Sequence, residues 1–587
     1  MSLPDSLPLQ RRVPSLRKRL TVLYGDQADA ALQTLETATT EIVAKLDGTS
    51  TQKSPRWTER DIVLITYGDQ LRFSADEDEA KTALAAQRDW LLREGLDRLI
   101  NIVHLLPFCP YSSDDGFSVI DYLAVDPACG GWGDIAALGE RFDLMFDLVL
   151  NHMSEHGEWF QAYLRGDAGF EKFFIQIDPA ADLSQVTRPR PGPPWKEFDG
   201  VRRDGAAGKK LVWSTFSAGE TKDQMDLNYE DPRVLAEMMR VLLEYAHRGA
   251  RIVRLDAVAF LWKVIGTTCM HLPQTHEVVK LARDLLAAVS PRTLVLTETN
   301  VPHDENVSYF GELTAAEGDR AAEGDEAHMV YNFSLPPLLL DAFANEDATA
   351  IRSWLEDLED PPPGCTFFNF TASHDGIGLR PLEGLVSDER LAKLGEYVSA
   401  RGGKVNMRLR PDGTESPYEL NITYVDAMAP DTDDQKLHAR RFLASQAVML
   451  ALRGMPALYF HSLVGTQNDH AGVESSGQNR RINRHKYTLR ELDEHLANES
   501  SLARRIYQGY CELLQQRTDQ PAFHPDAPQE VIGTSNDAVL AFKRTSLDGA
   551  HSVTVAVNFS MMPQAVLIEG EPTEIAAGDC VYFLAHQ

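Results

Sequence analysis

With 587 residues the chain is too long for one small domain, and its 43% hydrophobic and 25% charged content is that of an ordinary globular protein. Its 87 acidic residues outnumber the 57 basic ones and give a net charge of −30. This balance argues against a nucleic-acid partner or an anionic membrane surface, because phosphate groups select a basic protein face. The six cysteines are scattered without a CxxC pair, so neither a zinc site nor a disulfide framework is indicated.

The N-terminal segment, residues 1–58, is predicted to be a helical extension. It contains the helical pattern "DAALQTLETATTEIVAKL", which is followed by the polar break "DGTSTQKSPRW". The basic residues near the start precede no apolar core, so no secretory signal is indicated. No window of the chain reaches the roughly 18 to 20 apolar residues of a membrane span. We therefore expect a soluble, cytoplasmic protein with no membrane partner.

Eight short apolar runs then alternate with amphipathic helical stretches, which is the pattern of a (β/α)8 barrel. The barrel is expected to comprise residues 59–152, 226–375 and 433–520. Its eight expected strands lie within residues 61–68, 100–107, 142–152, 251–258, 293–298, 328–333, 365–374 and 456–461.

Two intervals between these strands are too long to be simple connections. Residues 153–225 follow the third strand, and residues 376–432 follow the seventh. Insertions of this size on a barrel usually cover its active-site face, so we expect two inserted domains there. Residues 521–587 contain short alternating runs that predict a small antiparallel β domain. The expected fold class is thus α/β, a TIM barrel with two insertions and a C-terminal β domain.

The stretch "GARIVRLDAVAF" places two charged residues, Arg254 and Asp256, in an otherwise apolar strand. A buried charge is costly unless it is paired or used. Residues two apart in a strand point to the same side, so Arg254 is expected to hold Asp256 ionised. On this segment alone, a structural ion pair and a catalytic carboxylate explain the pattern equally well.

Two further acids stand at the ends of predicted barrel strands. Asp256 ends the fourth strand, Glu298 ends the fifth, and Asp375 follows the seventh. The carboxyl ends of barrel strands meet at one face, so these three side chains are expected to converge on one pocket. Catalysis explains this convergence better than three independent surface caps do. Two carboxylates at a sugar pocket are what glycosyl transfer requires, one as nucleophile and the other as acid and then base.

Four stretches, "DLVLNH", "GARIVRLDAV", "VLTETN" and "NFTASHDG", resemble the four ordered sequence blocks of the α-amylase superfamily, glycoside hydrolase family 13. Others, "PFCPYSSDDGFSVIDY", "RPRPG", "GTTC", "LPPLLL" and "RRINRH", resemble its sucrose phosphorylase subgroup. The resemblance covers about residues 60–515. It implies a retaining phosphorylase, a glycosyltransferase that takes a small α-glucoside and inorganic phosphate, releases α-glucose 1-phosphate, and uses no metal or cofactor.

The resemblance also implies roles for individual residues. Asp256 matches the nucleophile, Glu298 the general acid/base and Asp375 the carboxylate that stabilises the transition state, while Arg254 matches the arginine that keeps the nucleophile ionised. The residues that match contacts to the glucosyl unit are Asp114, Phe117, His152, His374 and Arg480. The residues that match phosphate contacts are Arg190 and Tyr418.

The acceptor side departs from the sucrose phosphorylase pattern, which puts sucrose in doubt. The departures are Thr187, Phe260, Asn300 and the stretch Ser416, Pro417, Tyr418 and Glu419. The N-terminal extension resembles that of subgroup members acting on glucosylglycerol or glucosylglycerate.

Charge in the second insertion favours one of these two substrates over the other. If Glu419 faces the acceptor, it would repel a glycerate carboxylate and accept hydrogen bonds from glycerol. Lys404, Arg408 and Arg410 would act in the opposite sense. We favour 2-O-α-glucosylglycerol, with glucosylglycerate and sucrose as the alternatives.

Two other classes of function are weighed against this hypothesis. A hydrolase or transglucosidase would share the three acids and would differ in making its product without phosphate. A non-catalytic sugar-binding protein is disfavoured because all three acids are present. No pattern in the sequence predicts an oligomeric state.

Overall fold

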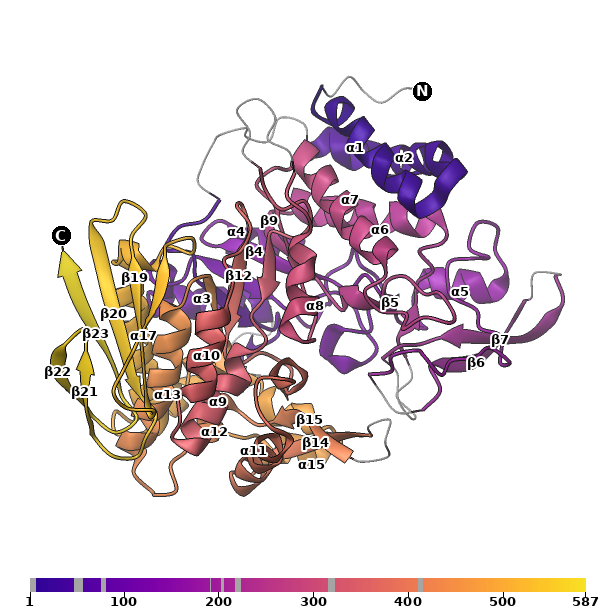
Figure 1. The fold of residues 1–587 in the computed structure, drawn as a ribbon. Coiled ribbons are helices and arrows are strands. Elements are labelled where there is room, and N and C mark those ends of the chain that lie inside the picture. Colours follow the sequence, from indigo (N-terminus) through magenta and orange to yellow (C-terminus); the bar gives the residue numbers. More distant parts are fainter. Residues whose placement is uncertain are drawn as a thin grey trace.

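The computed structural model describes residues 7–46, 56–74, 81–189, 192–201, 205–216, 223–314, 322–409 and 415–586. At its centre is a closed barrel of eight parallel strands (Figure 1). Around the barrel these are β1 (Val63–Thr66), β3 (Ile102–Leu105), β4 (Asp143–Leu148), β9 (Ala250–Leu255), β10 (Leu294–Thr297), β11 (Met329–Tyr331), β12 (Thr366–Phe370) and β16 (Met455–Tyr459). Each lies within one of the eight predicted runs, except that β9 and β16 begin one residue earlier, so the predicted fold class is confirmed.

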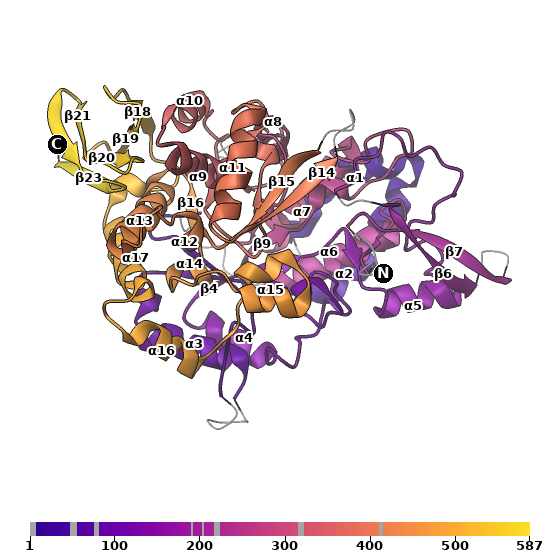
Figure 2. The same cartoon turned by 90° about the horizontal axis from the view of Figure 1, so that it is seen from below.

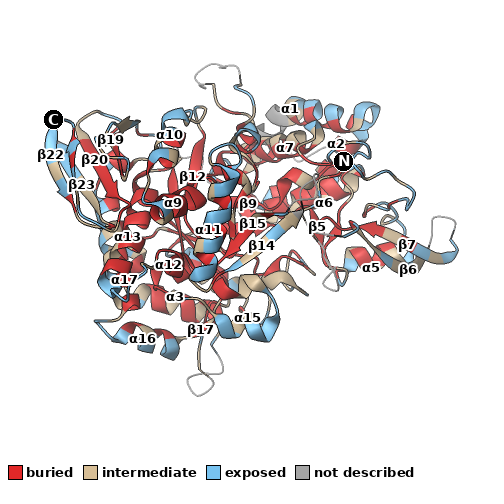
Figure 3. Cartoon of the chain, turned by 60° about the horizontal axis from the view of Figure 1, so that its bottom comes forward, coloured by how far each residue is buried: buried red, intermediate tan, exposed pale blue. Residues whose placement is uncertain are grey.

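The barrel strands are apolar because both of their faces are buried, one in the barrel interior and the other against helices. Every residue of β1 and of β3 is buried. The charged exceptions are paired inside the barrel, where Arg254 of β9 bonds Asp147 of β4. Figure 3 shows the buried residues concentrated in this centre, with exposed residues at the periphery.

Helices surround the barrel, and several begin at side-chain caps. At the start of one helix the Asp231 carboxylate accepts the Arg233 N–H at 3.0 Å and Pro232 takes the first helical position. The main helices are α3 (Ala83–Arg93), α4 (Trp132–Gly139), α6 (Pro232–His247), α7 (Pro273–Val289), α9 (Leu335–Asn345), α10 (Thr349–Asp357), α13 (Gln435–Ala451), α16 (Leu489–Ala497) and α17 (Leu502–Thr518).

Two segments are inserted between barrel strands. The first, after β4, contains β5 (His152–Met153), α5 (Glu158–Arg165), β6 (Trp195–Val201), β7 (Ala207–Trp213) and β8 (Met225–Asp226); β6 and β7 form an antiparallel ribbon that projects from the molecule (Figure 2). The second, after β12, contains β13 (Ile377–Gly378), α11 (Asp388–Ala400), β14 (Lys404–Leu409) and β15 (Glu415–Asn421). Its three strands form an antiparallel sheet in the order β13, β15, β14.

The N-terminal helices α1 (Leu7–Tyr24) and α2 (Ala28–Leu46) pack on α7 and α6 (Figure 1). Arg19 of α1 ties this pair of helices to the barrel. Its guanidinium lies 2.9 Å from Asp325, 3.3 Å from Asp284 and 3.5 Å from Glu277. The helices are therefore anchored by buried charge as well as by apolar packing.

The C-terminal region forms antiparallel sheets, as predicted. Four strands pair in the order β18 (Gln529–Ile532), β19 (Val539–Thr545), β20 (His551–Asn558) and β23 (Cys580–His586), and β21 (Gln564–Ile568) pairs with β22 (Glu571–Ile575). The Tyr582 hydroxyl donates to the carbonyl of Ala447 in α13 at 2.9 Å, which fixes the sheet to the barrel helices. In the part of the chain that the structure describes, no helix is both long enough and apolar enough to span a membrane.

Candidate active site

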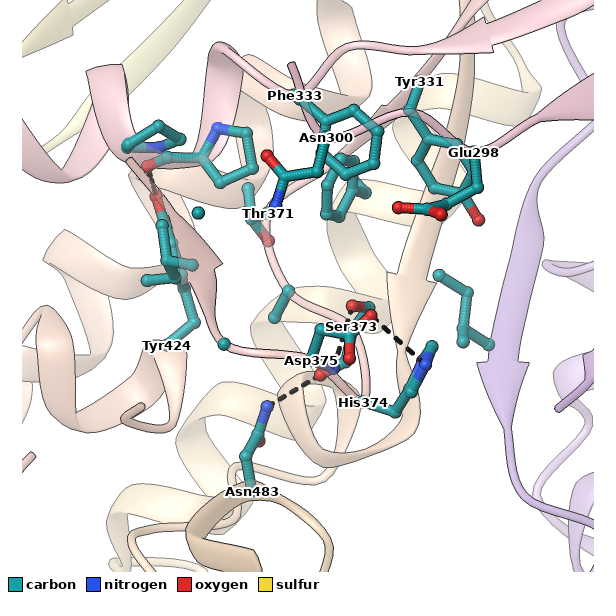
Figure 4. Close-up of a pocket in the computed structure, with 18 of the residues that line it drawn as sticks. Glu298, Asn300, Tyr331, Phe333, Thr371, Ser373, His374, Asp375, Tyr424 and Asn483 are labelled. Carbon is teal, nitrogen blue, oxygen red and sulfur yellow. Dashed lines mark hydrogen bonds and ion pairs between the residues drawn. The ribbon is translucent and has the colours of Figure 1, made fainter. Parts of the chain in front are cut away.

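A cavity of about 1080 Å³ lies at the carboxyl ends of the barrel strands and is bordered by both inserted segments. Asp256, Glu298 and Asp375 all line it, so the structure brings together the three acids that the sequence placed at strand ends. A smaller pocket of about 40 Å³ adjoins it and shares Glu298 and Asp375. Figure 4 shows Glu298 on one side of this pocket and Asp375 with His374 on the other.

Asp256 follows directly after β9 and is held by both backbone and side-chain bonds. Its N–H donates to the Leu148 carbonyl at 3.1 Å, and Arg254 Nη1 lies 2.7 Å from its Oδ1. The next residue, Ala257, has a φ of 52°, a conformation that L-residues adopt rarely. This turn ends the strand and fixes the direction of the carboxylate.

Arg254 lies between two carboxylates, because it also bonds Asp147. Burial opposes ionisation of Asp147, but Arg254 and His104 outweigh burial and lower the pKa of Asp147 to about 2. The His104 Nε2 is 2.6 Å from Asp147 Oδ2. Asp147 and His104 therefore fix the guanidinium that contacts Asp256.

Glu298 differs from the other two acids in its partners. Its Oε2 accepts the Ala257 N–H at 3.0 Å, and its own N–H donates to the Leu255 carbonyl at 3.0 Å. Within the described residues no guanidinium is within hydrogen-bond or ion-pair distance of this carboxyl group. Burial raises the pKa of Glu298 above its ordinary value.

Burial also raises the pKa of Asp256, and Arg254 acts against it. Each of the two carboxyl groups raises the cost of ionising the other. Since only Asp256 is bonded to a guanidinium, the proton of this pair is expected on Glu298. One ionised carboxylate and one neutral carboxylic acid then face the same cavity.

Asp375 is ionised for a different reason. Burial would raise its pKa, but Arg480, His374 and Arg484 outweigh burial and hold the pKa well below its ordinary value. Arg480 Nη1 lies 2.6 Å from Asp375 Oδ1. The same guanidinium bonds Glu419 in β15 through Nε at 3.1 Å and Nη2 at 2.6 Å. Arg480 thus bridges an acid of the barrel and an acid of the second insertion.

The residues that the sequence analysis matched to glucosyl contacts all line the cavity: Asp114, Phe117, His152, His374 and Arg480. The Phe117 ring stacks on His374 with centroids 4.7 Å apart and planes 9° apart. His152 Nε2 lies 3.0 Å from the Phe117 carbonyl oxygen and is bonded to backbone in this structure. Together they form a wall with an apolar ring and polar edges, which suits one sugar ring.

Arg484 is a buried residue of this site to which the sequence analysis gave no role. Its side chain is fully buried and donates to the His374 carbonyl at 2.8 Å and to Asp115 at 2.8 Å. Asp114 and Asp115 have φ values of 51° and 48°, a strained backbone that needs such support. The signal was present in the stretch "RRINRH", from which only Arg480 was assigned.

The predicted phosphate and acceptor residues have mixed outcomes. Arg190 and Arg410 lie outside the described residues. Tyr418 and Glu419 line the cavity from β15, and Thr187, Phe260 and Asn300 line it from other loops. Lys404 is exposed and does not line the cavity, and Arg408 is paired with Glu383. A further cation that lines the cavity, Arg380, was not singled out by the sequence analysis.

One cluster of potential metal ligands occurs among the described residues. The side chains of Glu155, His156 and Asp223 bring one ligand atom each within 4.8 Å of one another. Asp223 already accepts the Glu155 N–H at 2.8 Å, and Glu155 is paired with Lys196. None of the three lines the cavity, so the cluster has no part in the site.

Comparison with known proteins defines the class first. The model of the α-amylase catalytic domain matches residues 99–359. The solved structure of sucrose 6F-phosphate phosphorylase from Thermoanaerobacter thermosaccharolyticum superposes with a TM-score of 0.72 at 23% identity, covering 90% of this chain and 99% of that one. The fold is therefore that of the α-amylases.

Curated relatives define the subgroup. Glucosylglycerate phosphorylase of Spirochaeta thermophila is 46% identical over 86% of this chain and 81% of its own length. Glucosylglycerol phosphorylase of Marinobacter adhaerens is 29% identical over 76% of this chain and 86% of its own. The chain belongs to glycoside hydrolase family 13, to the phosphorylases related to sucrose phosphorylase.

Proposed function

We propose that the protein is a retaining α-glucoside phosphorylase whose substrate is glucosylglycerate, which it converts with inorganic phosphate to α-glucose 1-phosphate and glycerate. The observation that carries the retaining mechanism is the difference in partners among the three acids. Asp256 and Asp375 each contact a guanidinium, and Glu298 contacts none among the described residues. This pattern supplies the ionised nucleophile and the neutral acid that double displacement requires.

In the first half-reaction a carboxylate oxygen of Asp256 attacks the anomeric carbon of the glucosyl unit. The glycosidic C–O bond breaks, and the departing glycerate oxygen takes the proton of Glu298. The product is a covalent glucosyl ester on Asp256 and an ionised Glu298. Asp375, kept ionised by Arg480, is adjacent to the positive charge that develops on the sugar ring.

In the second half-reaction a phosphate oxygen attacks the same carbon from the side that glycerate has left. Ionised Glu298 takes the proton of the attacking phosphate, the ester bond to Asp256 breaks, and α-glucose 1-phosphate leaves with retained configuration. We assign Arg190 and Tyr418 to the phosphate, on the strength of the family resemblance. A cation and a hydroxyl are the groups that a phosphate needs in order to displace water beside carboxylates.

Glycerate replaces glycerol as the acceptor that we favour, for two reasons. The glucosylglycerate phosphorylase is 46% identical to this chain, against 29% for the glucosylglycerol phosphorylase. The preference for glycerol also rested on repulsion between Glu419 and an anionic acceptor, and Glu419, which lines the cavity, forms a two-point pair with Arg480. The Arg480 guanidinium, which also contacts Asp375, reduces the repulsion that Glu419 exerts on an anionic acceptor.

The test is product formation with and without phosphate. The purified protein should release α-glucose 1-phosphate from glucosylglycerate only when phosphate is present, and in reverse it should glucosylate glycerate faster than glycerol or fructose. Glucose release that is independent of phosphate would indicate a hydrolase. A preference for glycerol or fructose would contradict the assignment of glycerate as the acceptor and leave the phosphorylase mechanism in place.

Replacing the nucleophile tests the mechanism itself. Asp256→Asn keeps the size of the side chain and removes its charge, so phosphorolysis should fall by at least about a thousandfold while the melting temperature stays near that of the wild type. Asp89→Asn is a matched control, since Asp89 on α3 is 41% exposed and its one ion pair among the described residues is with its neighbour Arg88. Near-normal phosphorolysis by Asp256→Asn would refute the assignment.

A further inference from the structure

We propose that Arg380 binds the carboxylate of the acceptor and thereby makes the enzyme select a short hydroxy acid over a neutral polyol. This inference rests on the proposed phosphorylase function. Arg380 begins a short 3-10 helix, Arg380–Leu382, in the second inserted segment, and it lines the cavity with its side chain 21% exposed. It stands two residues after Gly378, against which the Asn300 side chain packs.

The other arginines that line the described part of the cavity already have partners. Arg480 bonds Asp375 and Glu419. Arg408 is paired with Glu383 and also donates to the Ser416 hydroxyl at 3.3 Å. Arg188, which also lines the cavity, is exposed and donates to the Gly192 carbonyl at 3.2 Å. Arg480 and Arg408 therefore have little capacity left for an anionic substrate, and water screens the charge of Arg188.

Arg380 differs from them in that its side chain has no hydrogen-bond partner within the described ranges. Its Nε is buried and makes no bond, and its nearest carboxylate is that of Glu305, 3.9 Å from Nη2. That separation is too long for a hydrogen bond. A buried donor without a partner has a desolvation cost. An anion that accepts a hydrogen bond from this guanidinium removes that cost, which favours its binding.

Glu305 is a weak competitor for Arg380. Its side chain is 46% exposed, and its carboxylate also lies 3.4 Å from His271 Nε2. Exposed ion pairs contribute little because water screens them. A substrate carboxylate that enters the cavity and displaces water would bond Arg380 more strongly and at two points.

The surroundings of Arg380 fit a small acid. Asn300 lines the cavity and its Oδ1 is buried without a partner among the described residues, which makes it an acceptor for a hydroxyl group. The apolar residues Ala259, Phe260, Met270 and Val301 form one cluster, and all of them line the cavity. Glycerate carries a carboxylate and hydroxyl groups on adjacent carbons. The carboxylate can accept hydrogen bonds from Arg380, and a hydroxyl group can donate one to Asn300.

Acceptor kinetics of Arg380→Gln test the proposal. In the synthesis direction, with α-glucose 1-phosphate as donor, the KM for glycerate should rise roughly 10- to 100-fold, which is the loss expected when a charged hydrogen-bonded pair is removed. The preference for glycerate over glycerol should fall by a similar factor, because glycerol has no carboxylate to pair with Arg380 and its KM should not change. Arg380→Lys should restore part of the preference, since it keeps the charge and loses the two-point geometry.

Arg292→Gln is the matched control, because Arg292 is exposed and precedes β10, at the opposite end of the barrel from the cavity. It should leave all constants unchanged. If Arg380→Gln raised the KM for phosphate and for α-glucose 1-phosphate but not for glycerate, Arg380 would be a phosphate ligand and the proposal would be wrong. An unchanged KM for glycerate would also overturn it. Failure of the proposed function would be visible earlier, as a wild-type enzyme without phosphate dependence or preference for glycerate.

Discussion

Glu298 pairs with no guanidinium in the described ranges, and this affects its protonation. Burial raises its pKa, while Asp375, half-buried in the same cavity, has its pKa held low by Arg480 and its neighbours. Two carboxyl groups of similar burial therefore differ in protonation because of the cations beside them. The raised pKa of Glu298 should affect both its role as an acid and the pH dependence of stability, and Glu298→Gln tests the two effects separately.

Glu298→Gln should lose phosphorolysis of glucosylglycerate by about a hundred- to ten-thousandfold, because the glycerate oxygen leaves without a proton. With α-glucosyl fluoride, whose leaving group needs no proton, the variant should still form the glucosyl ester. Rapid-quench measurement of ester formation from both donors checks this. Equal losses with the two donors would contradict the role as an acid.

The same variant should become more stable than the wild type as pH rises. In the unfolded chain Glu298 titrates near 4.5, and its pKa is raised in the folded protein. The folded state therefore holds the proton more tightly, so this contribution to stability is complete below the unfolded pKa and is lost as pH rises through the folded pKa. Glutamine has no such titration. The melting temperature of Glu298→Gln minus that of the wild type should increase from about pH 4 to about pH 8, and a constant difference would contradict a raised pKa.

At the residue scale, the three acids were predictable because strand ends point to one face of a barrel, so position in the sequence determines position in space. The pairing of Glu419 with Arg480 and the position of Arg380 in the cavity were not predictable. Glu419 and Arg380 lie in an insertion, where neither helical nor strand periodicity fixes which side chains meet. Arg480 is 61 positions from Glu419, and no spacing rule joins them.

Strand β13 and the loop after β10 approach each other more closely than side chains normally allow. A Cβ at Gly378 would lie 2.6 Å from Asn300 Oδ1, and one at Gly376 would lie 2.6 Å from Glu419 Cγ. The missing Cβ at Gly378 lets the second insertion lie against the loop after β10, and the missing Cβ at Gly376 lets the insertion pack against its own strand β15.

Gly378→Ala should therefore displace the Asn300 side chain and raise the KM for the acceptor several-fold, with a smaller effect on ester formation from α-glucosyl fluoride. Gly395→Ala, in α11 of the same insertion, is the matched control. Its new Cβ would meet Pro417 at 3.6 Å, an ordinary contact, and alanine favours the helix by roughly 0.5–1 kcal/mol. Equal acceptor KM values in the two variants would contradict the role of the close approach.

At the element scale, the eight barrel strands were predictable because each is a short apolar run between helical stretches. The strands of the second insertion were not resolved from sequence. They are short and partly polar, and the pairing of β14 with β15 shifts register between Asn406 and Met407. Such a bulge interrupts the alternation on which strand prediction depends.

At the scale of the whole molecule, Arg19 joins the N-terminal helices to the barrel and is expected to stabilise the folded state. Its side chain is 9% exposed and faces three carboxylates that are 12% to 14% exposed. Arg19→Ala leaves these acids without their shared cation, and we expect a loss of about 3 kcal/mol in the free energy of unfolding. Denaturant unfolding measures it.

Arg17→Ala is the control on the same helix. Arg17 pairs with Asp29, but the two side chains are 56% and 78% exposed, so its loss should cost less than about 1 kcal/mol. Equal stabilities of the two variants would show that the N-terminal helices are held by apolar packing alone.

The bridge formed by Arg480 limits how this enzyme can change its substrate. One guanidinium serves Asp375, on the donor side, and Glu419, in the acceptor-facing sheet. A mutation at Glu419 that alters acceptor choice also releases Arg480 and so weakens the hold on the sugar, and the two properties cannot be selected independently there. Arg380 is under no such constraint, because it shares no partner with the catalytic acids. A change of acceptor is therefore expected to cost less at position 380 than at position 419, which directed evolution can test.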